Sequence, residues 1–196
     1  MIPRYRAIET VLGHVAEEDL VLTTTGMVSR EAFAVRDRPG TFYMIGSMGL
    51  LSSLGLGLAL LDPWRRVFVL EGDGSALMSL GTLALIGAEA PRNLVHVVLD
   101  NEAYESTGGQ PSISARVSLA EVARASGYGS VAQAEDGPAL EEALAALGRG
   151  AGPHFLLVKV GIAPVKGIPR VTLSPAEIRD RFRAHIAASA SARRPA

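Results

Sequence analysis

The chain has 196 residues, which suits one domain, because two full cofactor-binding domains would need roughly twice the usual domain length. Its composition of 48% hydrophobic and 20% charged residues, with a net charge of -1, excludes an intrinsically disordered chain and a basic nucleic-acid-binding protein. The lack of cysteine excludes disulfides, thiolate metal sites and a cysteine nucleophile.

The N-terminal segment gives no sign of a targeting signal. Residues 1–20 are amphipathic and include acidic side chains, and they lack the apolar core and small-residue cleavage site of a signal peptide. The longest apolar stretch, residues 49–61, is too short for a membrane span, which needs about 20 residues. We therefore expect a cytoplasmic protein without a membrane span, and we interpret that stretch as a buried helix.

Short runs rich in Val, Leu and Phe alternate with helical patterns, which is typical of a parallel sheet covered on both faces. The expected strands are residues 20–24, 67–71, 94–100, 130–133 and 155–160. The expected helices are residues 8–16, 30–35, 49–61, 76–88, 119–125 and 139–147, with a last helix from about Ser174. These elements predict a doubly wound, mainly parallel α/β sheet with helices on both faces. We expect one domain over residues 1–188 and a frayed tail at 189–196.

Ligands of such sheets bind outside the carboxyl ends of the strands, so the residues after each strand are the first candidates for a site. The segment Glu71-Gly72-Asp73-Gly74-Ser75 follows an expected strand and opens an expected helix. Its glycines allow the backbone to approach a ligand, the N–H groups at the helix start can face an anion, and Asp73 can hold a cation. Ordinary turn chemistry is the competing explanation.

A second polar loop, residues 100–104 (DNEAY), follows the next expected strand. Strands that follow each other in this pattern are usually neighbours in the sheet, so Asp73 and Asn101 should lie close together. Mg²⁺ takes about six oxygen ligands and is bound through one or two carboxylate-type side chains, a backbone carbonyl, water and substrate phosphate. The two loops therefore predict a magnesium site.

The GDGS and LDNEAY segments, with Asn101 lying 28 positions after Asp73, together resemble the thiamine diphosphate (ThDP) binding motif. The resemblance implies a ThDP-binding domain of the diphosphate type, in which Mg²⁺ is held by the side chains of Asp73 and Asn101 and the main-chain carbonyl of Ala103. Asp100 stands where the motif has its first asparagine, but the second asparagine is the ligand, so the departure leaves the metal site in place. Further cofactor contacts are implied at Gly72, Gly74, Ser75 and Tyr104.

The loop of residues 45–49 (IGSMG) resembles the segment over which ThDP enzymes bend the cofactor. The resemblance implies cofactor contacts at Gly46, Ser47 and Met48, with the Gly46 carbonyl accepting from the 4'-amino group and Met48 acting as an apolar wedge. A core methionine is the alternative for Met48. Thr25 is a candidate contact for the diphosphate, as is Ser75, and turn or capping chemistry is the alternative for both.

The stretch YESTGGQP, residues 104–111, together with TTTGMVSRE and IGSMG, is similar to phosphonopyruvate and sulfopyruvate decarboxylases over nearly the whole chain. These enzymes act on a 2-oxo acid that carries a second anionic group, and the chain resembles the β subunit of the sulfopyruvate enzymes. No glutamate here has a context that would place it on the pyrimidine ring, so the resemblance implies an α subunit that supplies it. We expect an α/β hetero-oligomer with two-fold symmetry.

Three residues of that stretch, Gly108, Gly109 and Gln110, are candidates for binding an anionic substrate, because they offer two N–H groups and an amide. A flexible surface loop is the alternative. The basic partner of the second anion could be Arg116, Lys159 or Lys166. The four histidines (His14, His96, His154 and His185) show no ligand spacing, and we interpret them as structural.

Other functions stay open from the sequence. One is a ThDP-dependent carboligase of the acetolactate synthase type. A 2-oxo acid oxidoreductase subunit is another, although the chain lacks the cysteines of an iron–sulfur cluster. The third is a subunit that binds ThDP for assembly without turnover.

Overall fold

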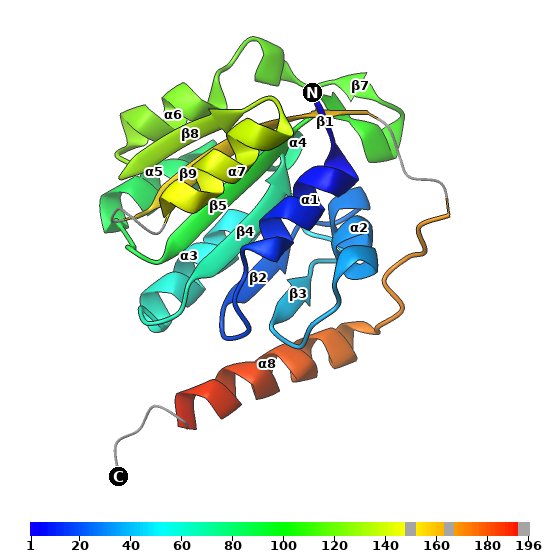
Figure 1. Ribbon diagram of the computed structural model, residues 1–196, viewed down its shortest axis with the longest axis vertical. Helices are drawn as coiled ribbons and strands as arrows, with labels where there is room; N and C mark the ends of the chain where they lie inside the picture. The colour runs from blue at the N-terminus through cyan, green and yellow to red at the C-terminus, as the bar shows by residue number, and fades with distance from the viewer. Residues whose placement is uncertain (148–151, 163–166, 192–196) are drawn as a thin grey trace.

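The computed structural model describes residues 1–147, 152–162 and 167–191, and in the last three of these only the backbone. Its centre is a seven-stranded sheet in the order β1-β9-β5-β4-β2-β3, with β8 also paired to β9 (Figure 1). Every ladder of this sheet is parallel, which confirms the predicted fold class. The strands are β1 (Ile2–Pro3), β2 (Leu20–Thr23), β3 (Thr41–Tyr43), β4 (Val67–Gly72), β5 (Leu94–Asp100), β8 (Ser130–Ala134) and β9 (His154–Gly161).

Helices cover both faces of the sheet because residues on alternate sides of each strand need apolar partners. In Figure 1, α1 and α7 lie in front of the sheet and α3 lies behind it. Val97 of β5 packs in the core shared with α1, α2 and α7, while Val98 packs in the core shared with α3, α5 and α6. The helices are α1 (Arg4–Gly13), α2 (Met27–Val35), α3 (Leu51–Leu61), α4 (Asp73–Met78), α5 (Leu80–Glu89), α6 (Leu119–Ser126), α7 (Gly137–Ala146) and α8 (Pro175–Ser191).

Two local predictions were wrong. The helix expected over residues 76–88 is two helices, α4 and α5, because Ser79 leaves helical geometry with φ -129° and ψ 36°. The short edge strands β1 and β3 were also missed. Residues 192–196 of the predicted frayed tail lie outside the described residues, and α8 continues to Ser191.

The carboxyl ends of β2, β4 and β5 meet at one edge of the sheet, since Thr23 pairs with Leu70 and Gly72 pairs with Leu99. A small antiparallel ribbon follows β5 there, formed by β6 (Ala103–Tyr104) and β7 (Gln110–Pro111). The 3-10 turns η1 (Glu105–Thr107) and η2 (Ile113–Ala115) flank the ribbon. In the described part of the chain, no helix has the length and hydropathy of a membrane span.

Candidate functional site

A cavity of about 240 Å³ opens at the carboxyl ends of β2, β4 and β5. Nine of the fourteen residues predicted for the site line it: Thr25, Met48, Gly72, Asp73, Gly74, Ser75, Asn101, Ala103 and Tyr104. The other five, Gly46, Ser47, Gly108, Gly109 and Gln110, do not line it. Loops that are far apart in the sequence thus come together where the strand ends predicted they would.

Asp73 begins α4 and is buried, with 1% of its surface exposed. Its Oδ2 accepts a hydrogen bond from the Ser112 hydroxyl and lies 3.2 Å from Oγ of Ser114. Burial raises the pKa of Asp73 above its ordinary value, and the neighbouring carboxylate of Asp100 raises it further, while the serine hydroxyls oppose the shift. A cation would relieve both unfavourable effects on this carboxylate.

Asp100 does not line the cavity, although it stands in the first asparagine position of the motif. Its Oδ1 accepts from the Ser114 hydroxyl at 2.8 Å and from the N–H of Glu102 at 3.1 Å. Its Oδ2 accepts from Nζ of Lys159 at 2.7 Å. The Lys159 ammonium also donates to Glu102 at 2.7 Å, so its charge is balanced at this edge. Asp100 thus departs from the motif outside the cavity lining, and its effect on the cavity is the added negative charge beside Asp73.

Asn101 is held by hydrogen bonds at both ends of its side-chain amide. Its Oδ1 accepts from the N–H of Ala103 at 3.1 Å, and its Nδ2 donates to Oε2 of Glu105 at 3.2 Å. Between Asn101 and Ala103 the chain turns at Glu102, whose φ of +58° is a left-handed conformation that non-glycine residues seldom adopt. The side-chain oxygen Oδ1 of Asn101 is thus oriented by its neighbours.

Arg4 was not predicted for the site, yet it lines the cavity and is buried. Its Nε and Nη2 donate to the two carboxylate oxygens of Glu31 at 2.8 and 2.9 Å, and its Nη1 donates to Glu105. Burial alone would lower the pKa of Arg4, but the two carboxylates outweigh it and raise the pKa overall. Because these residues lie 27 and 101 positions from Arg4, no local signal in the sequence could reveal the cluster.

The hydroxyl of Ser75 joins two of the predicted loops. It donates to Oε2 of Glu71 at 2.5 Å, and it accepts from the N–H of Gly49 at 3.2 Å and from the hydroxyl of Thr24 at 3.3 Å. Its one proton is therefore committed to Glu71. The hydroxyl of Thr25, in contrast, makes no hydrogen bond to any described residue.

Met48 is not a core residue, because 37% of its surface is exposed and it lines the cavity. It sits between Ser47, with φ +53°, and Gly49, with φ +90°. Opposite it, a Cβ on Gly74 would lie 3.2 Å from Met48 Cε and 2.4 Å from Tyr104 Cε1. Only glycine fits at position 74 while Tyr104 and Met48 keep their places.

The segment from Gly108 to Gln110 is an exposed turn away from the cavity. Gly108 and Gly109 have positive φ values of 122° and 74°. The amide of Gln110 donates to the Thr107 carbonyl at 2.8 Å, and its oxygen accepts from the Thr107 hydroxyl at 2.9 Å. These three residues are exposed and do not line the cavity, and their substrate role stays a prediction.

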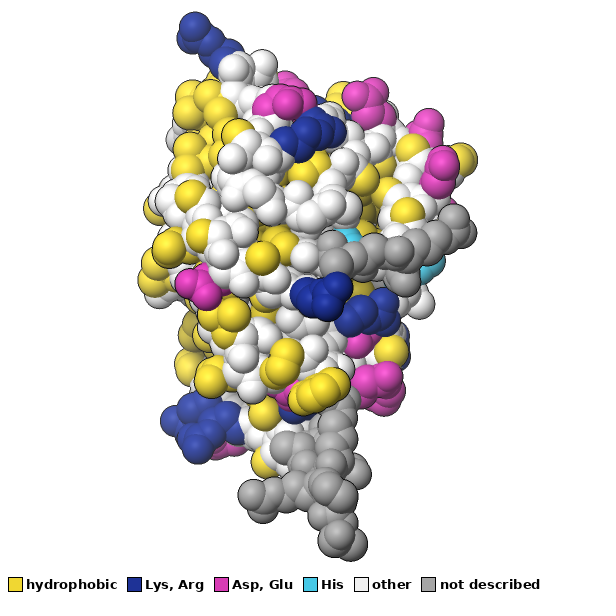
Figure 2. Space-filling model, turned by 90° about the vertical axis from the view of Figure 1, so that its left-hand side faces the viewer, with side chains coloured by type: hydrophobic (Ala, Val, Ile, Leu, Met, Phe, Trp, Pro, Cys, Tyr) yellow, Lys and Arg dark blue, Asp and Glu magenta, His cyan; other side chains and the backbone are white. Residues whose placement is uncertain are grey.

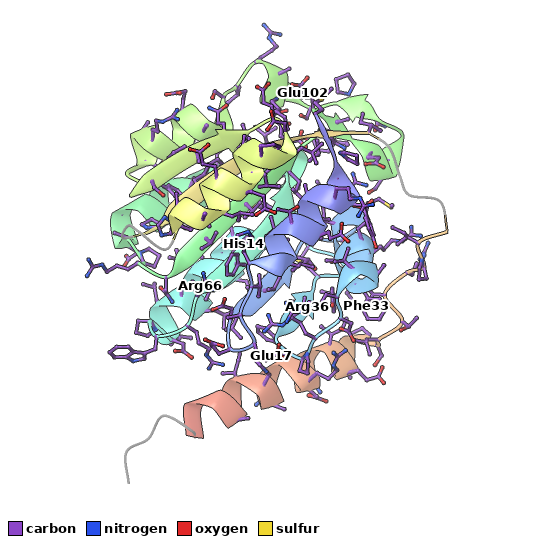
Figure 3. The ribbon with its side chains drawn as sticks, in the orientation of Figure 1. His14, Glu17, Phe33, Arg36, Arg66 and Glu102 are labelled. Atoms are coloured by element: carbon purple, nitrogen blue, oxygen red, sulfur yellow. The ribbon has the colours of Figure 1, made fainter. Side chains whose placement is uncertain are left out.

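The histidines do not form a site in the described part of the chain. His96 is buried, with Nε2 2.7 Å from Oε1 of Glu71 and Nδ1 2.9 Å from the Tyr128 hydroxyl. His154 is also buried and contacts the hydroxyl of Ser130. In Figure 3, His14 lies well away from Glu102, which marks the edge of the sheet next to the cavity. The structural interpretation of these histidines agrees with their contacts.

A parallel α/β domain that gathers a buried aspartate, an oriented asparagine and an exposed methionine around one cavity at its strand ends has the arrangement of a cofactor-binding domain. Residues 24–158 match the family described as thiamine pyrophosphate enzyme, C-terminal TPP binding domain. The chain belongs to this family.

The chain is also similar in sequence to named decarboxylases over most of its length. The chain is 45% identical to sulfopyruvate decarboxylase subunit beta of Methanothermobacter thermautotrophicus, over 93% of this chain and 94% of that subunit. It is 43% identical to phosphonopyruvate decarboxylase of Streptomyces viridochromogenes, over 93% of this chain and 46% of that enzyme. The chain thus spans about half the length of the phosphonopyruvate decarboxylases it matches.

Solved structures agree with the fold. Benzoylformate decarboxylase from Polynucleobacter necessarius superimposes with a TM-score of 0.70 at 18% identity, over 82% of this chain and 33% of that one. At this identity the likeness supports the fold alone.

Proposed function

We propose that this chain binds ThDP and Mg²⁺ in the cavity and forms the diphosphate-binding half of a decarboxylase acting on sulfopyruvate or phosphonopyruvate. The observation that best supports the proposal is the net negative charge of the residues that line the cavity. Asp73 and Glu105 are anionic, and Arg4, the single cationic side chain among the described lining residues, is already paired with two carboxylates. This lining would repel a diphosphate unless a divalent cation came with it.

The residues present fit a metal and a diphosphate together. Asp73 and Asn101 would hold Mg²⁺ through side-chain oxygens, and Ala103 would add its carbonyl, which leaves positions for phosphate oxygens and water. The unbonded hydroxyl of Thr25 would meet the diphosphate. The missing side chain at Gly74 would let the cofactor approach the backbone closely.

When bound, ThDP would supply the nucleophilic carbon and the electron sink that decarboxylation of a 2-oxo acid requires. The residues of this chain would orient the cofactor and exclude water. Met48 would contact the cofactor from the cavity wall, and Val28 and Leu99 would keep that wall apolar. A dry, apolar wall strengthens every electrostatic contact made within it.

An activating glutamate is expected from a partner subunit. Glu105 is the one glutamate among the described residues that line the cavity, and it is committed to Arg4 and Asn101. Glu71 faces Ser75 and His96 in the interior. We therefore propose an α subunit that carries the pyrimidine-binding domain, within a two-fold symmetric α/β assembly.

Exposed apolar side chains support the idea of a partner. Five apolar side chains on α3, the turn after it, the end of α4 and α5 are exposed: Leu54, Leu61, Trp64, Met78 and Leu85, at 37%, 84%, 83%, 61% and 57%. Figure 2 shows hydrophobic side chains gathered along one side of the molecule. Helices that face water usually carry polar residues there, and a large apolar surface is typical of a protein interface.

The test is to purify the chain with a candidate α subunit and measure carbon dioxide release from sulfopyruvate and from phosphonopyruvate, with ThDP and Mg²⁺ present. We expect turnover of one of the two only when both subunits are present. Acetolactate formation from pyruvate would instead indicate a carboligase. Cofactor binding without turnover of any 2-oxo acid would indicate an assembly subunit and would contradict the proposal.

A further inference from the structure

A second cavity, of about 730 Å³, lies beside the first and shares a wall with it. Five residues line both: Thr25, Gly26, Met27, Glu105 and Ser106. Position 26 of this wall requires glycine, because φ is +89° and a Cβ would lie 2.9 Å from Oγ of Ser106. Since the two cavities share lining residues, a molecule that reacts at the shared wall could reach both.

The second cavity is also lined by α2 and by described residues that precede α8. In Figure 1 the chain from residue 167 onward runs down beside α2 to the start of α8. It contributes Arg170 and Val171, while α2 contributes Arg30. Met44 and Ile45, which follow β3, add apolar surface. The cavity thus combines an apolar side with two guanidinium groups.

The guanidinium group of Arg30 is held in place by neutral hydrogen-bond acceptors. Its Nε donates to the carbonyl of Pro169 at 3.2 Å and its Nη2 donates to the carbonyl of Ile168 at 2.6 Å. Both acceptors are neutral, and no carboxylate of the described residues forms an ion pair with Arg30. These bonds also fix the backbone just before Arg170. Arg30 therefore helps to set the backbone position of Arg170.

Arg170 is exposed and makes no hydrogen bond or ion pair with any residue in the described ranges. The one acidic residue lining this cavity is Glu105, which shares Arg4 with Glu31, so Arg30 and Arg170 leave the lining with a net positive charge. The second cavity is therefore cationic where the first is anionic. A group with two or three acceptor oxygens and a negative charge fits two guanidinium groups well.

We propose that the second cavity receives the second anionic group of the substrate, and that Arg30 and Arg170 recognise it. The inference rests on the proposed function, and it names the residues that select a sulfonate or phosphonate over an uncharged methyl group. The 2-oxo carbon would react next to Gly26 and Ser106 of the shared wall. The anionic end would then extend toward the arginines, away from the anionic metal cavity.

Two of the three basic residues suggested by the sequence do not fit this role. Lys159 is paired with Asp100 and Glu102. Arg116 lines neither cavity, and Lys166 lies outside the described residues. Arg116 therefore provides a matched control, since it is an exposed arginine that the proposal does not use.

The experiment compares wild type, Arg170→Gln, Arg30→Gln and Arg116→Gln, each reconstituted with the α subunit. Steady-state kinetics are measured with sulfopyruvate, phosphonopyruvate and pyruvate, and ThDP affinity is measured by calorimetry. For Arg170→Gln we expect kcat/KM for the preferred dianionic substrate to fall about 10- to 100-fold, because a charge-assisted hydrogen bond is lost. Activity on pyruvate and ThDP affinity should stay within about twofold of wild type, as should all values for Arg116→Gln.

A second readout covers the case in which pyruvate turns over too slowly. Sulfoacetate, phosphonoacetate and acetate are titrated as competitive inhibitors, and only the first two should lose affinity in Arg170→Gln. Equal losses for acetate and the dianions, or no loss at all, would overturn the inference while leaving the decarboxylase intact. A wild-type complex that binds no ThDP or turns over no 2-oxo acid would instead overturn the proposed function, and this inference with it.

Discussion

Replacing Glu71 by alanine should weaken both the fold and the cofactor cavity. The carboxylate of Glu71 is fully buried, and it accepts from the Ser75 hydroxyl at 2.5 Å and contacts Nε2 of His96 at 2.7 Å. Ser75 in turn holds the N–H of Gly49, next to Met48. The network therefore connects the interior of the sheet to two loops of the site.

The magnitude follows from the groups left without partners. Glu71→Ala leaves a buried hydroxyl and a buried imidazole nitrogen unsatisfied, at about 1–3 kcal/mol each, so the free energy of unfolding should fall by about 2–6 kcal/mol. Glu71→Gln keeps the volume and can still pair one of the two groups, so its loss should be about 1–3 kcal/mol. ThDP affinity should fall in both variants, because the anchor of Gly49 through Ser75 is disturbed.

Urea unfolding followed by circular dichroism measures the stability, and calorimetry measures ThDP affinity. Glu142→Ala, at an exposed position of α7, is the matched control and should change the stability by less than about 0.5 kcal/mol. The double variant with Ser75→Ala should be non-additive by about 0.5–3 kcal/mol. A Glu71→Ala loss no larger than the control, or strict additivity with Ser75→Ala, would refute the reasoning.

Three further predictions concern single residues. Gly74→Ala should lower ThDP affinity about tenfold or more with the fold retained, because the new Cβ would displace the Tyr104 ring; unchanged calorimetric affinity would contradict this. Met48→Ala should lower kcat of the reconstituted enzyme more than ThDP affinity, whereas equal losses would indicate a mere packing role. Burial lowers the pKa of His154 below 6.5, so the unfolded chain takes up that proton first and stability should fall as the pH drops from about 7 to about 5. In urea titrations, His154→Gln should make the free energy of unfolding depend less steeply on pH. Part of this pH dependence should remain, because the pKa of His185 is also lowered, chiefly by burial.

The central strands could be predicted because their signal is local. β4, β5 and β9 are almost continuous apolar runs that end in polar or glycine residues. β3 has three residues and is defined by its register with β2, in which Val21 pairs with Thr41, so its own sequence gives little evidence of a strand. The break at Ser79 is equally hidden, since α4 and α5 are both apolar and read as one helix.

The same distinction holds for the site. Asp73 and Asn101 each follow a strong strand, and the parallel register alone brings them together. Arg4 reaches Glu31 and Glu105 only through the packing of α1 against α2 and the turn after β6, and nothing near Arg4 in the sequence indicates those contacts. The second cavity depends in the same way on the return of the chain past α2. Sequence patterns could therefore locate the strand ends, but not the side chains that approach them from other elements.

Calorimetric titration of ThDP into the chain with the proposed α subunit, in the presence and absence of Mg²⁺, tests the central claim most directly. We predict binding that requires Mg²⁺, a loss of about 100-fold or more in affinity for Asp73→Ala, and a smaller loss for Asn101→Ala. Affinity that is the same without Mg²⁺, or unchanged in both variants, would contradict a metal-anchored diphosphate at this cavity.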